Sequence, residues 1–153
     1  MRTHARLPST LILAAGLAAC AWLVFTQASS TSANANGEQF AALEKLIAAG
    51  KADAQVWQDY GDALADAKRF THAAAAYQKS LELEPDRREA RMGRLLALAQ
   101  GPNADAFFAY AQQLMNTDPK LTFDLLERRE CINKKSDPRF EPLYRTAKAQ
   151  AID

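Results

Sequence analysis

The side chains that most often carry chemistry in proteins, histidine and cysteine, are scarce in this chain. It has two histidines, His4 and His72, and two cysteines, Cys20 and Cys131. A metal site needs several such ligands at a defined spacing, and a serine or cysteine nucleophile needs a positioned base. The sequence offers neither pattern. We therefore expect no catalytic residue, no metal site and no cofactor, and we do not expect an enzyme.

The two cysteines lie in different kinds of segment. Cys20 belongs to an uncharged, apolar stretch near the N-terminus, and Cys131 is the single cysteine of the polar remainder. Cys131 therefore cannot close a disulfide within that remainder. A free cysteine behaves as a small apolar residue and is commonly buried, which is the expectation here. Pairing with a second chain is the alternative.

The elements that surround these residues are helical, and one stretch has a regular spacing of large, small and proline residues. Its spaced residues are Trp57, Tyr60, Gly61, Leu64, Ala73, Tyr77 and Pro85. Steps of three and four residues place the first four on one face of a helix. Asp53 and Thr71 are the expected N-caps of this helix and the next. Ala73 is expected to face Gly61 where the two helices cross, and Pro85 to stop the second helix.

This spacing resembles the tetratricopeptide repeat, a 34-residue helix-turn-helix unit. A second, degenerate copy follows, because Pro119 stands 34 residues after Pro85 and two helical runs, 86–100 and 104–116, lie between them. Arg91 and Arg94 there replace Trp57 and Tyr60. The resemblance implies an all-α fold, a short solenoid of helix-turn-helix units that binds other proteins or peptide segments.

The chain divides into three parts on this interpretation. An N-terminal segment, 1–28, and a polar spacer, 29–37, precede a domain of 116 residues, 38–153. This length suffices for one domain with its own core. The domain is expected to contain a lone helix, a repeat, a degenerate repeat and capping helices, at 39–49, 54–87, 88–121 and 122–151. Terminal repeats of a solenoid are commonly atypical because they cover its last apolar face.

Three local signals mark helix boundaries within this domain. Gly50 ends the lone helix. Gly101-Pro102-Asn103 separates the two runs of the degenerate repeat, and Asn103 can cap the second of them. Near the C-terminus, Ser136-Asp137-Pro138 restarts a helix with Pro138 at its first position.

The N-terminal segment has three interpretations. Arg2 and Arg6 precede an apolar run whose first following charge is Glu38. An uncleaved membrane anchor of about 20 residues is the leading one, and the positive-inside rule then places the domain outside the cytoplasm, in the periplasm of a Gram-negative bacterium. Leu17-Ala18-Ala19-Cys20 resembles a lipobox, so a lipoprotein lipidated at Cys20 is the second. A cleaved secretory signal is the third.

Charge excludes one class of partner. Without Arg2 and Arg6, 17 basic residues remain against 18 acidic ones. A nucleic-acid-binding domain would carry a strong basic excess, so nucleic acid is not expected. The one cationic cluster comprises Arg87, Arg88, Arg91 and Arg94, and we expect a solvated face that pairs with Glu82, Glu84 and Glu89.

The resemblance also implies a binding surface, since the first helix of each repeat in this family lines a concave groove for a peptide. The corresponding residues are Gln55, Gln58, Asp62 and Asp66 in the first repeat and Glu89, Met92 and Leu96 in the second. One subgroup grips a C-terminal carboxylate with lysines and asparagines at such positions, and Gln58 and Asp62 do not match it. The groove is mildly acidic with an apolar end, which favours partners with basic and apolar residues.

Two classes of function are consistent with these observations. The first is a membrane-tethered interaction scaffold on the outer face of a bacterial inner membrane, which binds client or assembly proteins. Its layout is similar to the tetratricopeptide component of cytochrome c maturation systems, and envelope assembly is the rival pathway. The second is a structural accessory subunit of a membrane enzyme complex.

Overall fold

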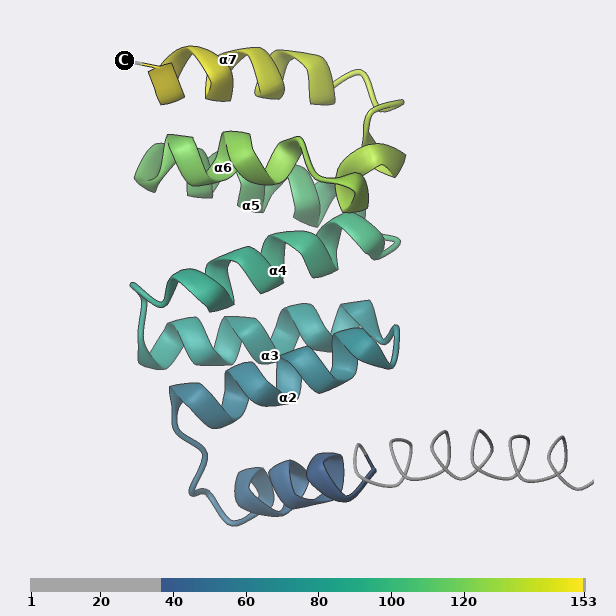
Figure 1. The fold of residues 1–153 in the computed structure, drawn as a ribbon, viewed down its shortest axis with the longest axis vertical. Helices are drawn as coiled ribbons and strands as arrows, with labels where there is room; N and C mark the ends of the chain where they lie inside the picture. Colours follow the sequence, from purple (N-terminus) through teal and green to yellow (C-terminus); the bar gives the residue numbers. More distant parts are fainter. Residues whose placement is uncertain (1–36, 153) are drawn as a thin grey trace, which may run out of the picture. The chain divides into compact units, whose positions relative to one another are not determined.

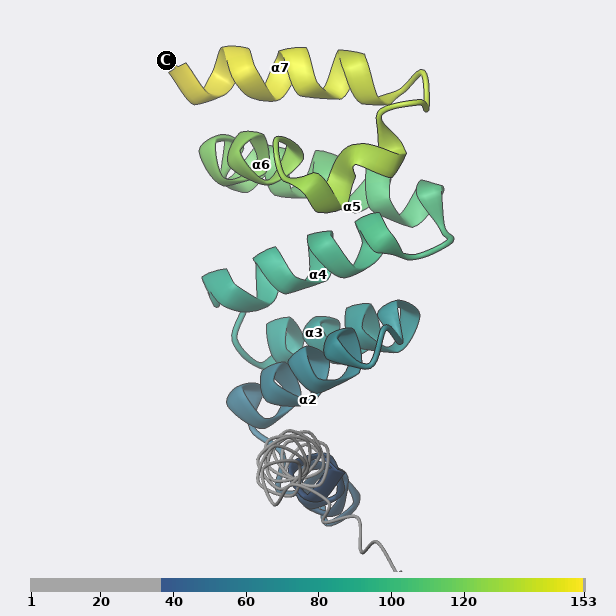
Figure 2. The ribbon, with the colours of Figure 1, turned by 45° about the vertical axis from the view of Figure 1, so that its right-hand side comes forward.

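The domain is all-α, as predicted. The computed structural model describes residues 37–152. In the compact unit from Phe40 to Asp153, consecutive helices pack against one another in chain order, and Figures 1 and 2 show them stacked along one direction. This arrangement is compatible with a helical repeat.

The predicted anchor at 1–28 lies outside the described residues, as do Cys20 and nearly all of the spacer at 29–37. Among the helices that the structure does describe, none has the length and apolar character needed to cross a membrane.

The helices follow the predicted order. Residues 37–48 are helical, followed by α2 (Ala54–Asp66), α3 (Phe70–Leu83), α4 (Arg88–Gln100), α5 (Ala104–Thr117), α6 (Pro119–Leu126), the 3-10 helix η1 (Arg129–Lys134) and α7 (Phe140–Ile152). Gly50 follows the first of them in a left-handed conformation, with φ of 67°, and its N–H donates to the carbonyl of Ile47 at 3.0 Å. It ends the helix as predicted, because glycine adopts positive φ without steric cost.

The predicted cap of α2 is confirmed and that of α3 is wrong. The Asp53 carboxylate accepts from the backbone N–H of Val56 at 2.8 Å. Helix α3, however, begins at Phe70, before Thr71, and Arg69 stands at its cap without a side-chain hydrogen bond. The tight turn that ends α2 explains this early start, since the N–H of Arg69 donates to the carbonyl of Leu64 at 2.8 Å. Arg69 is thereby fixed at the entry of α3.

Helices α2, α3 and α4 meet at the ring of Tyr77, which is only 3% exposed. A methyl group added at Gly61 of α2 would lie 2.8 Å from this ring, and one added at Gly93 of α4 would lie 2.5 Å from it. The ring is therefore held between two glycines on different helices. The expectation that Ala73 faces Gly61 is corrected: Tyr77, one turn further along α3, fills the space that Gly61 leaves.

The pair α4 and α5 packs with the sizes of its side chains exchanged relative to α2 and α3. At a spacing of 34 residues, Leu95 replaces Gly61, Phe107 replaces Ala73 and Ala111 replaces Tyr77. All three replacements are fully buried. The large buried ring of the second pair, Phe107, therefore lies near the start of α5, whereas that of the first pair, Tyr77, lies in the middle of α3.

Pro119 has a different role from Pro85. Pro85 lies in the turn after α3, whereas Pro119 is the first residue of α6, where a missing N–H costs nothing. Asp118 caps α6 by accepting from the N–H of Leu121 at 2.9 Å. The 34-residue spacing of the two prolines thus marks a helix end in one case and a helix start in the other.

The 3-10 helix η1 closes the end of α4. Asn133 donates its side-chain amide to the carbonyl of Ala99 at 3.3 Å, and Lys134 donates Nζ to the carbonyl of Gly101 at 2.9 Å. These carbonyls belong to the last turn of a helix, where no intrahelical partner exists. Lys134 is only 8% exposed, so its side chain is largely buried where it donates to Gly101.

The last helix, α7, begins two residues later than predicted, at Phe140 rather than Pro138. The Asp137 carboxylate accepts from both the backbone and the side chain of Arg139, which lowers the pKa of Asp137 to about 2. This local loop holds the chain out of the helix until Phe140. The apolar side chains of Phe140, Leu143 and Ala147 on α7 are buried in the C-terminal core.

Candidate functional site

The predicted groove residues of α2 lie on the surface of the helix and are partly occupied by contacts within the chain. Gln55 and Gln58 both accept from Nη1 of Arg87, at 2.6 and 3.2 Å. Asp62 accepts from the hydroxyl of Tyr77 at 2.5 Å. Asp66, at the end of α2, is exposed. Of the four, Asp66 is therefore the residue whose side chain a partner could engage without displacing a contact that the structure records.

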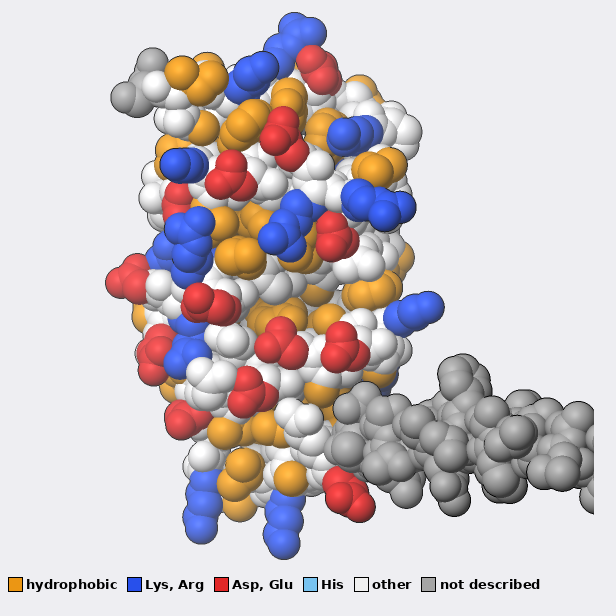
Figure 3. All heavy atoms as spheres, in the orientation of Figure 1, with side chains coloured by type: hydrophobic (Ala, Val, Ile, Leu, Met, Phe, Trp, Pro, Cys, Tyr) orange, Lys and Arg blue, Asp and Glu red, His pale blue; other side chains and the backbone are white. Residues whose placement is uncertain are grey.

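Three carboxylates form an acidic row on α2: Asp59, Asp62 and Asp66, at steps of three and four residues. Figure 3 shows several acidic side chains over the region of α2 to α4 on the face in view, with apolar side chains between them. Burial raises the pKa of Asp62 above its ordinary 3.8, its hydrogen bond from Tyr77 opposes this, and the like charges of Asp59 and Asp66 raise it further. The ionised Asp62 is thus held at some cost in stability.

We expect Asp62→Asn to raise the free energy of unfolding at pH 7 by about 0.2–0.5 kcal/mol, the size of a relieved like-charge pair on a helix. The amide oxygen can still accept from Tyr77. Because the pKa of Asp62 is raised in the folded state, its stabilising contribution is present below pH 3.8 and is lost as the pH rises through the raised value.

Urea unfolding at pH 3 and pH 7 measures this effect. The difference between the variant and the parent should be largest at pH 7 and close to zero at pH 3. A variant that is less stable than its parent at pH 7 would show that the carboxylate holds Tyr77 better than an amide does.

The predicted apolar end of the groove is partly covered. Met92 and Leu96 of α4 pack against the C-terminal core and are only partly exposed, because η1 and α6 lie against α4. Glu89 remains exposed in the first turn of α4. The predicted acidic residues are therefore more accessible than the predicted apolar ones.

The cationic cluster separates into individual contacts rather than a patch. Arg87 pairs with Glu84 at 3.0 Å, as predicted. Arg88 approaches Asp118 at 3.8 Å and Arg91 pairs with Asp86 at 2.6 Å, which corrects the expectation that Glu82 and Glu89 would be their partners.

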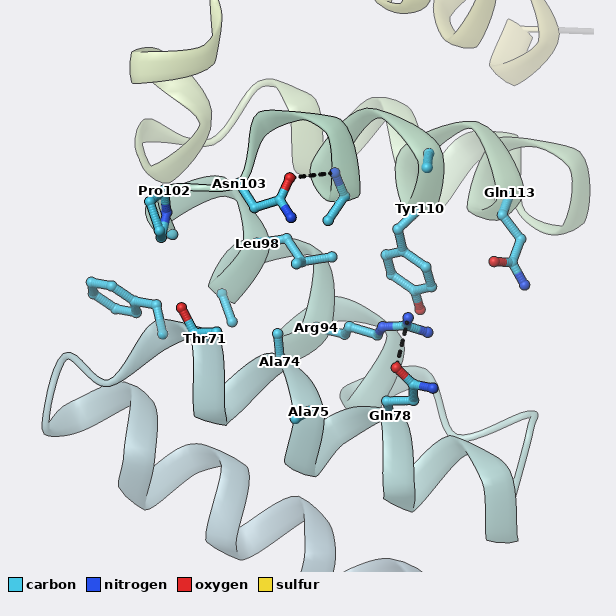
Figure 4. A pocket seen from close by; sticks show the side chains of 15 residues that line it. Thr71, Ala74, Ala75, Gln78, Arg94, Leu98, Pro102, Asn103, Tyr110 and Gln113 are labelled. Atoms are coloured by element: carbon cyan, nitrogen blue, oxygen red, sulfur yellow. Dashed lines mark hydrogen bonds between the residues drawn. The ribbon is translucent and has the colours of Figure 1, made fainter.

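A hollow of about 390 Å³ lies between α3 and α5, with α4 as its floor. Figure 4 shows Thr71, Ala74 and Ala75 on the side of α3 and Tyr110 and Gln113 on the side of α5. Its small apolar residues are Ala74, Ala75, Ala97, Ala106 and Ala109. This surface is formed by the second helix of each pair, so it is distinct from the predicted groove on the first helices.

Arg94 is the single charged residue among those that line this hollow. Its guanidinium lies 4.2 Å from the centre of the Tyr110 ring and donates to the side-chain oxygen of Gln78 at 3.2 Å. The aromatic ring attracts the cation, and the two contacts fix its position, as Figure 4 shows. Burial raises the pKa of Tyr110, so its hydroxyl stays neutral at physiological pH.

The residues with conventional reactivity do not form a site. His72 is exposed in the first turn of α3. Cys131 is fully buried, as predicted, its Sγ donates to the carbonyl of Leu125 at 3.4 Å, and burial raises its pKa to about 11. A thiol in this state is a poor nucleophile. Within residues 37–152, no group of histidine, cysteine and carboxylate side chains could hold a metal ion.

The chain was compared with models of known protein families, with curated proteins and with solved structures. None of them matches it.

Sequence reasoning missed two residues. Gly93 contacts Tyr77 from α4, but an isolated glycine in a helical stretch gives no indication of which ring it faces. Arg94 stands where the first repeat has Tyr60, and this substitution alone gives no indication that Arg94 lines a hollow. The available signal was the set of alanines on neighbouring helices, because small side chains that face one another leave space. Those that line the hollow are Ala74, Ala75, Ala97, Ala106 and Ala109.

Proposed function

We propose that this protein is a protein-interaction module of the tetratricopeptide type, tethered by its N-terminal segment to the outer face of a bacterial inner membrane. In this proposal it binds client or assembly proteins and performs no catalysis. Cytochrome c maturation and envelope assembly are the two pathways in which such a module would serve.

The packing around Tyr77 is the observation that carries the proposal. Helices α2, α3 and α4 meet through residues of the repeat pattern, Gly61 and Tyr77, together with Gly93. Helix α4 also contacts α6, as α2 contacts α4. First helices of successive pairs that lie side by side form one continuous surface, which is how solenoid proteins bind extended partners.

The accessible acidic row on α2 gives the module a surface that favours basic partners. Charges of opposite sign across an interface speed association and select among partners. Asp62 also accepts from the hydroxyl of Tyr77, so an arginine at this position would remove a hydrogen bond within the domain as well as change the surface charge. Asp66 has no such contact among the described residues and is the better position for a test.

Affinity capture of the full-length protein and its Asp66→Arg variant from native membranes tests the proposal. We expect the parent to retain a specific set of proteins and the variant to lose most of them, because charge reversal turns attraction into repulsion. Ala149→Arg, at an exposed position of α7, is the matched control and should retain them.

Two other outcomes are informative. Recovery of the same proteins by both arginine variants would contradict binding at α2. Recovery of a single enzyme complex in fixed stoichiometry would favour the accessory-subunit alternative over a scaffold that binds clients.

A further inference from the structure

We propose that the hollow between α3 and α5 binds a peptide segment of a partner protein that carries a bulky apolar side chain next to an aspartate or glutamate. This inference rests on the proposed function, and it assigns to the module a second surface and the chemistry of its ligand. The surface comprises the residues around Arg94, and we call it the α3–α5 groove.

The shape of the α3–α5 groove accounts for the apolar part of the ligand. Its volume of about 390 Å³ falls within the range typical of ligand pockets. Alanines from three helices line it, together with Leu98 of α4 and Phe70, the first residue of α3. Because the alanine side chains are too short to meet across the hollow, a larger apolar side chain from outside can fill it and be removed from water.

The charge of the groove accounts for the acidic part of the ligand. Arg94 is its single charged residue, and among the described residues no carboxylate forms an ion pair with Arg94. Glu82 is an acidic residue whose carboxylate feels the charge of Arg94. It already accepts hydrogen bonds from Lys79 at 2.7 Å and from Gln78 at 3.1 Å. A guanidinium can donate two parallel hydrogen bonds to a carboxylate, and Tyr110 and Gln78 hold this one in place before the ligand arrives.

The length of the groove favours a peptide over a small molecule. A second hollow, of about 310 Å³, continues beyond Arg94 and shares Gln78, Arg94, Tyr110 and Gln113 with the first. Arg94 therefore borders both hollows, and Arg91 and Glu82 also line the second one. An extended chain with its apolar residue on one side of Arg94 and its carboxylate over the guanidinium fits this arrangement.

Selection of peptides on the purified full-length protein in detergent tests the inference. A phage library of random dodecapeptides is panned, and the most enriched peptide is synthesised for titration. We expect enriched sequences to share a bulky apolar residue close to an aspartate or glutamate. The affinity should fall at least about ten-fold in Arg94→Gln, because a charged hydrogen bond is lost.

A second variant and two controls make the result specific. Ala75→Trp, at an exposed position of the wall, should fill the groove and weaken binding by a similar factor. Ala149→Trp and Asp66→Arg should leave the affinity unchanged, and thermal melting checks that each variant is folded.

The remaining outcomes overturn the inference. Enriched peptides without a carboxylate, an affinity that survives both groove variants, or a library from which no peptide is enriched would each do so. If Asp66→Arg alone weakens binding, the groove is not the site while the proposed function stands. Native capture, described above, tests that function separately.

Discussion

Replacement of Tyr77 by alanine is expected to lower the free energy of unfolding by about 3–5 kcal/mol, the usual cost of removing a buried aromatic side chain. The ring is 3% exposed and fills the space between Gly61 and Gly93, so its loss opens a cavity at the meeting point of three helices. For a domain of marginal stability this loss is a large fraction of the total. Urea unfolding followed by circular dichroism measures it.

Two further variants make this result diagnostic. Tyr77→Phe keeps the ring and removes only the hydrogen bond to Asp62, so a loss of about 1 kcal/mol is expected. Trp57→Ala should cost less than Tyr77→Ala, because Trp57 is only partly buried against the same cluster. If Trp57→Ala proves the more damaging of the two, the packing centre lies at Trp57 and not at Tyr77.

The second expected result concerns Gly93, where alanine should destabilise the domain by about 1–3 kcal/mol through overpacking. Alanine normally stabilises a helix relative to glycine by roughly 0.5–1 kcal/mol. At Gly93, however, the new methyl group would lie 2.5 Å from the Tyr77 ring, which has no room to move because Gly61 confines its other side. The clash should therefore outweigh the gain in helix propensity.

A double variant tests whether the cause is this clash. In the Tyr77→Ala background the ring is absent, so Gly93→Ala should change sign and stabilise the domain by about 0.5–1 kcal/mol. A double-mutant cycle measures the coupling between the two positions. If Gly93→Ala has the same effect in both backgrounds, the ring does not pack on Gly93.

Much of the fold was predictable because its signals are local. The spacing of Trp57, Tyr60 and Leu64 predicted the apolar face of α2. Asp53 and Asn103 predicted the caps of α2 and α5, because a capping side chain contacts a neighbouring N–H. Predictions failed where contacts that the residue pattern does not reveal decided the outcome. The partner of Gly61 depends on a contact between helices. The start of α7 depends on local hydrogen bonds between Asp137 and Arg139.

The candidate site was predictable only in part, for a related reason. The contacts of Arg87 with Gln55 and Gln58 could not be predicted, because they join residues about 30 positions apart in the chain. The α3–α5 groove arises where three helices fail to fill the space between them. Periodicity indicates which side chains face inward, and it does not indicate where they are too small to meet.

Site-specific photo-cross-linking in native cells would test the claim of protein binding most directly. A photoreactive residue is introduced into the full-length chain at Asp66 on α2, at Ala75 in the α3–α5 groove, or at Ala149 on α7 as the control. All three positions are exposed. We expect a discrete cross-linked partner at Asp66, Ala75 or both, and none at Ala149. Cross-linking no greater at Asp66 and Ala75 than at Ala149 would contradict protein binding at both surfaces.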